Sequence, residues 1–177
     1  ILWFLGIRKK ISQRNFDICF NKEYSLKERD RILRESYANF CRSTVEFILL
    51  PKYKKTIDKF VNIIGIETLV NLKNESKGAI LSTGHFGSWE LFGTAIGSYG
   101  IGIDFVVGRQ SNELADRYFN SIREKCGIGV IQVRMGSRGI LKSLSNARMV
   151  AILSDQDARD AGIIVNFFGQ PASTFAG

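Results

Sequence analysis

The sequence is poor in the residues that build disulfide frameworks and metal centres. Its 177 residues include three cysteines and a single histidine, His85. Cys19, Cys41 and Cys126 are widely spaced and form no C-x-x-C pair, which argues against a disulfide framework and against a zinc site. A reducing compartment is the simplest setting for an odd number of cysteines. We expect all three to be small buried hydrophobic side chains.

Long apolar runs and nucleotide-binding motifs are also missing. No apolar run approaches the roughly 20 residues that a membrane-spanning helix needs. No P-loop or G-x-G-x-x-G motif follows an apolar run, so nucleotide binding has no support. The aromatic residues lie in apolar patterns, which gives no support to nucleic-acid binding. With 45% apolar residues and only two prolines, the chain is long enough for one sizeable core.

The net charge of +8 is unevenly distributed along the chain. Residues 1–59 hold 14 Lys or Arg against 7 Asp or Glu, a balance of +7, whereas residues 60–177 hold 11 against 10, a balance of +1. Such asymmetry suits an anionic membrane surface, an acidic carrier protein or nucleic acid. On charge alone, a solvated helix face explains it equally well.

The first ten residues resemble the end of a membrane-spanning segment. The apolar residues 1–7 include Trp3, and Arg8, Lys9 and Lys10 follow at once. An aromatic residue near a basic cluster is typical of a membrane exit on the cytoplasmic side. A short amphipathic interfacial segment is the alternative. We therefore expect an anchor before residue 1 and further chain after residue 177.

An amphipathic helix is predicted from Ser25 to Pro51. Ser25 and Glu28 have the spacing of a capping box, and proline disfavours continuation of a helix. Apolar residues at helical spacing predict its buried face: Leu33, Tyr37, Phe40, Cys41, Thr44, Val45 and Ile48. The other face carries Arg29, Arg31, Arg34 and Arg42.

From residue 60 onward, short apolar runs alternate with helical stretches, which predicts an α/β fold with a mostly parallel sheet flanked by helices. The division is then an N-terminal helical segment, residues 1–59, and an α/β core, residues 60–177. We expect strands near 60–64, 79–83, 103–107, 129–133 and 149–154, and helices near 66–75, 88–98, 111–126 and 137–146. Ser111 is expected to cap the third of these helices, and Gly127 to close it.

The most informative block is the segment from Gly84 to Glu90, directly after the predicted strand 79–83. Ligands of open α/β sheets bind at the carboxyl ends of strands, and histidine titrates near neutral pH, so His85 is the candidate general base. If Ser88 caps the next helix, Glu90 falls in its first turn and can turn back to orient the imidazole. Gly84 and Gly87 would relieve the tight backbone. A purely structural histidine is the alternative, and neither a metal site nor a G-x-S-x-G nucleophile is indicated.

Further candidates follow other predicted strands. Asp155 and Asp157 come after the last strand of the core and are expected either to orient a substrate hydroxyl and support the His85 loop or to cap a turn. Phe168 is expected in the core or in an acyl-chain pocket. Arg109 and Arg123 are candidates for binding a phosphate or a phosphopantetheine linker, with surface ion pairs as the alternative.

At these residues the sequence resembles the bacterial lipid A biosynthesis acyltransferase family, the late lauroyl and myristoyl transferases of the glycerolipid acyltransferase superfamily. The stretch 82–90 is like the family's H-x-x-x-x-[DE] block with its Gly and Trp. The blocks that support the resemblance are Arg109, Arg123 with Gly127, Asp155-Gln156-Asp157, and residues 167–174. They span nearly the whole chain.

The resemblance implies an O-acyltransferase with His85 as base and Glu90 as its partner. The donor would be acyl carrier protein, used as an acyl-thioester co-substrate without a cofactor, and the acceptor a hydroxyl of an anionic lipid A precursor. The protein would be associated with the inner membrane at its cytoplasmic face. Residues 163–166 precede the double Phe where a Phe-Val-Pro-like segment is expected, and Gln110 stands where many relatives have Pro, so acyl length and acceptor stay open.

Two other classes are possible. One is an acyltransferase of the same superfamily that acts on another membrane glycolipid or on a lysophospholipid, with acyl-CoA as the alternative donor. The E-G-T-R block usual in lysophospholipid acyltransferases does not occur here. The other is a non-catalytic membrane-binding module, against which the presence of both His85 and Glu90 argues.

Overall fold

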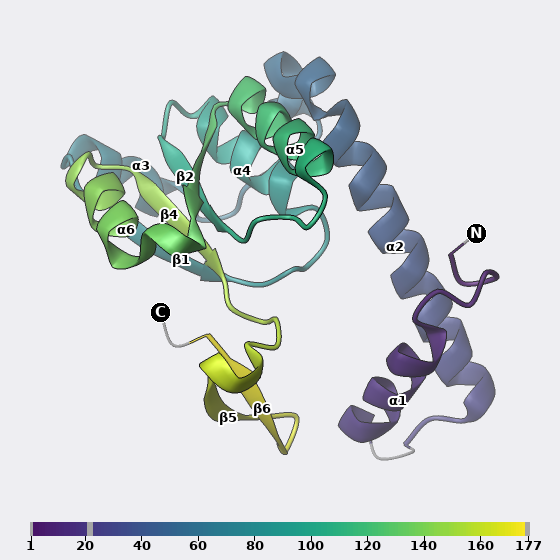
Figure 1. The fold of residues 1–177 in the computed structure, drawn as a ribbon. Coiled ribbons are helices and arrows are strands. Elements are labelled where there is room, and N and C mark those ends of the chain that lie inside the picture. Colours follow the sequence, from purple (N-terminus) through teal and green to yellow (C-terminus); the bar gives the residue numbers. More distant parts are fainter. Residues whose placement is uncertain (1, 21–22, 176–177) are drawn as a thin grey trace. The chain divides into compact units, whose positions relative to one another are not determined.

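The computed structural model describes residues 2–20 and 23–175 and divides the chain into two compact units (Figure 1). The smaller unit combines residues 1–44 with 156–176, and the larger unit consists of residues 45–155. The predicted domain boundary after residue 59 was placed where the alternation of strands and helices was expected to begin. This boundary stays a prediction.

The elements alternate through the larger unit as the sequence predicts. The helices are α1 (Lys9–Phe20), α2 (Leu26–Tyr53), α3 (Ile66–Asn74), α4 (Trp89–Ser98), α5 (Glu113–Cys126) and α6 (Gly136–Ser145). Short 3-10 helices are η1 (Lys54–Lys59), η2 (Val133–Met135) and η3 (Arg159–Ala161). The strands are β1 (Ala79–Thr83), β2 (Ile103–Val107), β3 (Ile128–Gln132), β4 (Met149–Leu153), β5 (Ile163–Phe167) and β6 (Gln170–Thr174).

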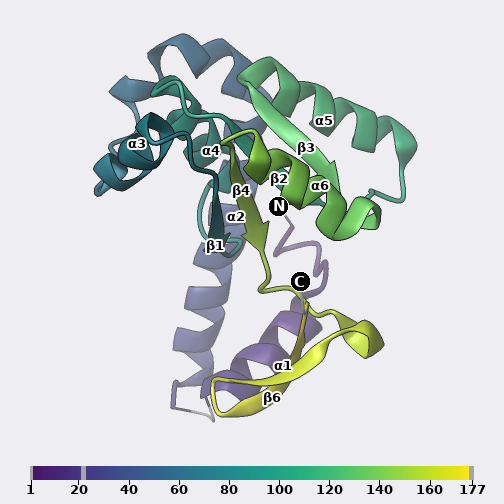
Figure 2. The same ribbon diagram turned by 90° about the vertical axis from the view of Figure 1, so that its left-hand side faces the viewer.

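The first four strands form one parallel sheet in the order β1-β4-β2-β3 (Figure 2). Because all four run in the same direction, the loops that follow them meet at one edge of the sheet, here called the carboxyl edge. The order places β4 directly beside β1, with Thr83 opposite Leu153. The predicted fold class, a mostly parallel sheet flanked by helices, is confirmed.

Neighbouring residues of a strand point to opposite faces of the sheet, and helices cover both faces. In β2, Phe105 faces α4 so closely that a methyl group on Gly93 would come within 2.5 Å of its ring. The preceding residue, Asp104, faces α6 and accepts a hydrogen bond from Ser143 Oγ at 2.5 Å. Arg148 completes this second cluster with Nη2 2.6 Å from Asp104 Oδ1, an interaction that raises the pKa of the guanidinium.

Helix α2 begins as predicted and ends slightly later. Ser25 N donates to Glu28 Oε2 at 3.0 Å and Glu28 N donates to Ser25 Oγ at 3.3 Å, which confirms the capping box. The prediction that Pro51 ends the helix is wrong, because α2 continues to Tyr53. A proline removes one backbone donor. Burial of the adjacent Leu50, which is 0% exposed, helps to offset that loss near the end of the helix.

The buried face of α2 differs from the predicted one because the helix contributes to two cores. Leu33 is buried with Trp3 and Phe16 in the smaller unit. Phe47 and Leu50 are buried in the core of the larger unit. Three residues of the predicted apolar face are instead exposed: Phe40, Val45 and Ile48.

Residues 60–64 do not form the predicted strand. They follow η1 without regular secondary structure, and Val61 and Ile63 pack against the core. Their apolar character therefore reflects partial burial without pairing to the four-stranded sheet. Ser111 was also predicted as the cap of α5, but the capping residue is Asn112, whose Oδ1 accepts from the backbone N–H groups of Leu114 and Ala115.

Two elements of the smaller unit were not predicted individually. Helix α1 follows a series of turns over residues 2–8, where the sequence had suggested the end of a membrane segment. Strands β5 and β6 form an antiparallel hairpin. Phe168 and Gly169 make its two-residue turn with positive φ angles of 52° and 71°, the combination that suits a tight hairpin.

Candidate active site

The backbone brings His85 and Asp155 together at the carboxyl edge. His85 lies two residues beyond β1 and Asp155 two residues beyond β4, and these strands are neighbours. The Nδ1 atom of His85 is 2.7 Å from Asp155 Oδ1, and the His85 backbone N–H donates to Asp155 Oδ2, also at 2.7 Å. One carboxylate therefore holds both the ring and the backbone of the histidine.

The close approach requires a glycine before the histidine. A methyl group on Gly84 would lie 2.9 Å from Asp155 Oδ2 and 2.6 Å from the ring of Phe86. Gly87, on the other side, has a φ of +56°, a left-handed conformation that few other residues adopt easily. The predicted tight backbone is thus present on both sides of His85.

The electrostatics of the pair suit a base. Burial alone raises the pKa of Asp155, but hydrogen bonds from the ring and the backbone of His85 outweigh it, and the pKa of Asp155 lies below its usual value. The carboxylate is therefore ionised at neutral pH and can accept a hydrogen bond from the tautomer of His85 that carries its proton on Nδ1. The two side chains are about 30% exposed, so a substrate can reach them.

Glu90 has a different partner from the one expected. It is 4% exposed in the first turn of α4, and its carboxylate is paired with Arg123 of α5. Arg123 Nη2 and Nε donate to Glu90 Oε1 at 2.5 and 3.0 Å, and the guanidinium lies 5.4 Å from the centroid of the Phe47 ring. In this geometry Asp155 makes the contact with the imidazole that was predicted for Glu90, and a catalytic part for Glu90 stays a prediction.

The remaining predicted residues have separate surroundings. Arg109 is two-thirds exposed and pairs with Glu113 one turn away, as a surface ion pair does. Asp157 accepts from the backbone N–H of Arg159 at 2.8 Å, which is the turn-capping alternative. Phe168 lies in the hairpin turn and packs against Phe20 and Phe167. Asp157 and Phe168 belong to the smaller unit, whereas the other five lie in the larger one.

Ser88 and Trp89 also belong to the block around His85. Ser88 was predicted to cap the next helix, and no contact was predicted for Trp89. Ser88 occupies the N-cap position of α4 as predicted, but its hydroxyl makes no capping hydrogen bond. The indole of Trp89 packs against the His85 ring, with centroids 4.7 Å apart and ring planes at 75°. An aromatic residue four positions after a histidine, at the start of a helix, is the only signal that the sequence offers for this contact.

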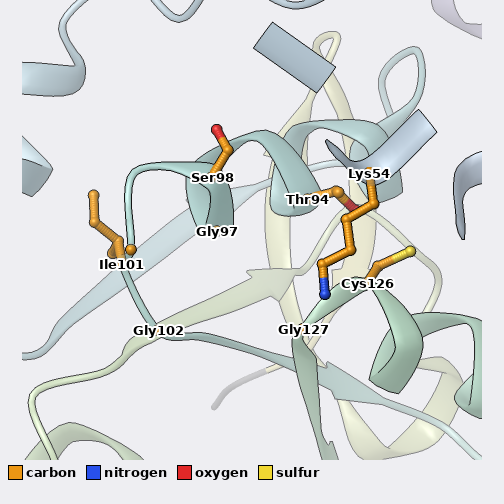
Figure 3. Close-up of a pocket in the computed structure, with 9 residues that line it drawn as sticks. Lys54, Thr94, Gly97, Ser98, Ile101, Gly102, Cys126 and Gly127 are labelled. Carbon is orange, nitrogen blue, oxygen red and sulfur yellow. The ribbon is translucent and has the colours of Figure 1, made fainter. Parts of the chain in front are cut away.

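A cavity of about 230 Å³ lies at the opposite edge of the sheet, where β2 and β3 begin (Figure 3). Lys54, Thr94 and Cys126 line it together with several glycines. The Lys54 ammonium donates to the carbonyl oxygen of Lys125 at the end of α5, and burial raises the pKa of the Cys126 thiol. This cavity contains neither His85 nor Asp155, whose pair lies at the carboxyl edge.

The described residues were compared with the requirements of a metal site and of a membrane-spanning helix. Within residues 2–20 and 23–175, no three His, Cys, Asp or Glu side chains are grouped as metal ligands would be. No helix in the same residues is both long and apolar enough to cross a membrane. Cys126 is buried, as predicted for all three cysteines, while Cys19 and Cys41 are partly exposed.

Comparisons with known proteins find acyltransferases. The chain is 27% identical over 154 residues to the phosphatidylinositol mannoside acyltransferase of Mycolicibacterium smegmatis, covering 84% of this chain and 50% of that protein. It is 24% identical over 174 residues to the lipid A biosynthesis palmitoleoyltransferase of Escherichia coli, covering 98% and 53%. A lipid A biosynthesis acyltransferase of Haemophilus influenzae is 22% identical over 168 residues, covering 94% and 52%.

The chain thus spans about half the length of the curated relatives that it matches. Residues 2–177 match the family described as bacterial lipid A biosynthesis acyltransferase, which is nearly the whole chain. The match includes both units of the structure and the block around His85. The chain belongs to the bacterial lipid A biosynthesis acyltransferase family.

Proposed function

We propose that this protein transfers a fatty acyl group from an acyl thioester to a hydroxyl of a membrane glycolipid, with His85 as general base and Asp155 as its orienting partner. The observation that carries the proposal is the His85–Asp155 pair at the carboxyl edge, with Nδ1 2.7 Å from the carboxylate. In a member of an acyltransferase family, that pair supplies the base that an alcohol acceptor needs.

The transfer proceeds in two steps. Nε2 of His85 removes the proton of the acceptor hydroxyl while its oxygen attacks the thioester carbonyl, and Asp155 stabilises the imidazolium that forms. The resulting tetrahedral intermediate then expels the thiolate. The thiolate takes the proton from the imidazolium, which restores the neutral base and leaves an acyl ester on the acceptor.

For the acyl donor we propose acyl carrier protein, and for the acceptor a lipid A precursor. Both are anionic, which suits a chain of net charge +8 whose first 59 residues carry nearly all of the excess. A phosphatidylinositol mannoside is the second candidate acceptor, because a relative with that name is 27% identical to the chain. With either lipid as acceptor, the enzyme acts at a membrane surface. Phe4 and Leu5, 82% and 67% exposed beside Arg8, suit such a surface.

The test is an acylation assay with a panel of donors and acceptors. The protein is incubated with labelled acyl carrier protein or acyl-CoA and with a lipid A precursor, a phosphatidylinositol mannoside or a lysophospholipid. We expect labelled product from the carrier-protein donor and one of the two glycolipids. Product from the lysophospholipid alone would contradict the proposed acceptor, and absence of any product would contradict the proposed reaction.

A further inference from the structure

Trp89 is the residue of the block around His85 whose part in the chemistry is still unassigned. Its indole meets the His85 ring at 75° with the centroids 4.7 Å apart. The indole is partly buried and packs against the main hydrophobic core, so it is anchored on its other side. The contacts of His85 therefore include Asp155 at Nδ1 and Trp89 against the ring.

Two contacts are needed because one hydrogen bond does not fix the plane of a ring. The terminal torsion of histidine is broad and roughly two-fold. An imidazole with a hydrogen bond at Nδ1 can still rock about its Cβ–Cγ bond within the range of angles that the hydrogen bond tolerates. A steeply inclined aromatic ring at van der Waals distance restricts that rotation. The Trp89 contact therefore determines where Nε2 is presented to a substrate hydroxyl.

The position of Trp89 is in turn determined by its neighbour Glu90. Both residues lie in the first turn of α4, and the buried Glu90 carboxylate accepts two hydrogen bonds from Arg123 of α5. Arg123 is itself fixed by Asn120, whose Oδ1 accepts from its Nη1 at 2.9 Å. The start of α4, and Trp89 with it, is therefore tied to α5 by charged hydrogen bonds that water barely reaches.

We propose that Trp89 is a positioning residue for His85, and that Glu90 and Arg123 act on His85 through Trp89. The proposal rests on the proposed function, in which His85 is the base. In this proposal Glu90 holds the first turn of α4 in place. That turn positions the indole of Trp89, and the indole restricts the orientation of the imidazole ring.

The experiment uses the fact that His85 is the only histidine in the chain. Labelling with ¹³C,¹⁵N-histidine therefore gives one set of imidazole NMR signals without assignment. In Trp89→Leu, we expect these signals to lose their indole ring-current shift and to broaden or split. We also expect kcat to fall about 10-fold, with KM within about two-fold of the parent, because a misplaced base slows the chemical step. Trp89→Phe should restore most of both.

Trp3→Leu is the matched control, since Trp3 is the only other tryptophan and lies in the smaller unit. The same substitution there should leave the imidazole signals unchanged. If Trp89→Leu does not fold, Glu90→Gln is compared in the parent and in the Trp89→Phe variant. The proposal then requires a clear change in the imidazole signals in the parent and a smaller one in the Trp89→Phe variant, where the aromatic contact is reduced.

A double-mutant cycle separates action through Trp89 from direct action on the imidazole. If Glu90 acts through Trp89, kcat of the Trp89→Leu, Glu90→Gln double variant is within about two-fold of that of Trp89→Leu. Multiplicative losses in kcat, or unchanged imidazole signals in folded Trp89→Leu, would overturn the proposal. The NMR result does not depend on turnover, so an inactive protein with the expected imidazole signals would contradict the proposed function and leave the positioning role standing.

Discussion

Two paired carboxylates of the larger unit, Asp155 with His85 and Glu90 with Arg123, differ in what surrounds them. His85 and Asp155 join the ends of two adjacent strands, and their side chains are 30% and 29% exposed. Arg123 and Glu90 join two helices, and their side chains are 15% and 5% exposed. In both pairs one carboxylate contacts two nitrogen atoms of the same partner residue.

The difference in exposure assigns the two pairs to different tasks. A general base must exchange a proton with a substrate, so it needs access from outside as well as a partner that orients it. A buried ion pair has lost most of its hydration and cannot meet a substrate. Its effect is to hold two elements in one arrangement, and removal of one partner leaves an uncompensated charge. Glu90 and His85 are five positions apart, yet only His85 has the surroundings of a base.

The largest effect is expected from removal of the imidazole. His85→Ala should lower kcat by about 10³-fold, because a positioned base contributes 10²–10⁴-fold in rate. The change removes a partly exposed side chain, so the melting temperature should stay close to that of the parent. The measurement is turnover with the labelled acyl donor beside a thermal denaturation curve. Near-parental turnover in a folded His85→Ala protein would exclude His85 as the base.

A loss of roughly 10²-fold in kcat is expected from Asp155→Asn, in which an amide replaces the carboxylate that fixes the proton on Nδ1. The pKa of Asp155 is lowered in the folded protein, so the ionised group stabilises the fold above the ordinary carboxyl pKa of about 3.9. That contribution is lost as pH falls through the depressed pKa of the folded state. The stability gap between parent and variant should therefore shrink below about pH 4 in denaturation curves measured across pH. A gap that did not depend on pH would show that the carboxylate charge is not what stabilises the site.

The buried pair should respond in the opposite way, with a large loss of stability. Arg123→Met leaves Glu90 buried without its cation, which is expected to lower the free energy of unfolding by about 3 kcal/mol. Arg109→Met is the matched control, because Arg109 is exposed in the loop before α5 and pairs with Glu113 at the surface, an arrangement worth about 0.2–1 kcal/mol. Chemical denaturation of the two variants makes the comparison. Equal losses would mean that burial of the Glu90 pair contributes nothing beyond a surface pair.

The features of the fold and of the candidate site that depend on residues close together in the chain could be predicted from the sequence. The strand limits of β1 and β2 agree with the prediction because each is a short apolar run between polar or glycine residues. The capping box at Ser25 needs only two residues three positions apart. The position of His85 at the carboxyl edge follows from the strand before it and the helix after it. Local signals therefore located the candidate site.

The partners within the site depend on strand order, which no local signal contains. Asp155 lies 70 positions after His85, and the two meet because β4 inserts between β1 and β2. The sequence favoured Glu90 as the partner because it is near in the chain, whereas the first turn of α4 directs Glu90 toward α5. The exposed Phe40 and Ile48 of α2 have a similar cause, since the helix serves two cores and its buried face changes along its length.

The smallest change in activity is expected from substitution of Arg109, and it concerns the encounter with the acyl donor. Arg109 and Arg123 were both candidates for binding a phosphate or a phosphopantetheine linker. The Arg123 guanidinium is paired with Glu90, so the exposed Arg109 is the better candidate for attracting an acidic carrier protein to the carboxyl edge. Rim charges of this kind act mainly on the rate of encounter, and the attraction is screened by salt. Arg109→Glu should therefore lower kcat/KM for the carrier-protein donor by about 3-fold at low salt, and less at high salt.

Acyl-CoA separates the two ways in which Arg109 can act, because it presents phosphates but no protein surface. If Arg109 attracts the acidic surface of the carrier protein, Arg109→Glu should reduce kcat/KM for acyl-CoA by a smaller factor than for the carrier protein in the same buffer. Arg109→Lys keeps the charge and should behave like the parent with both donors. Equal losses with both donors would place Arg109 at the acceptor lipid or at the phosphates that the two donors share, and would remove the charge argument for acyl carrier protein.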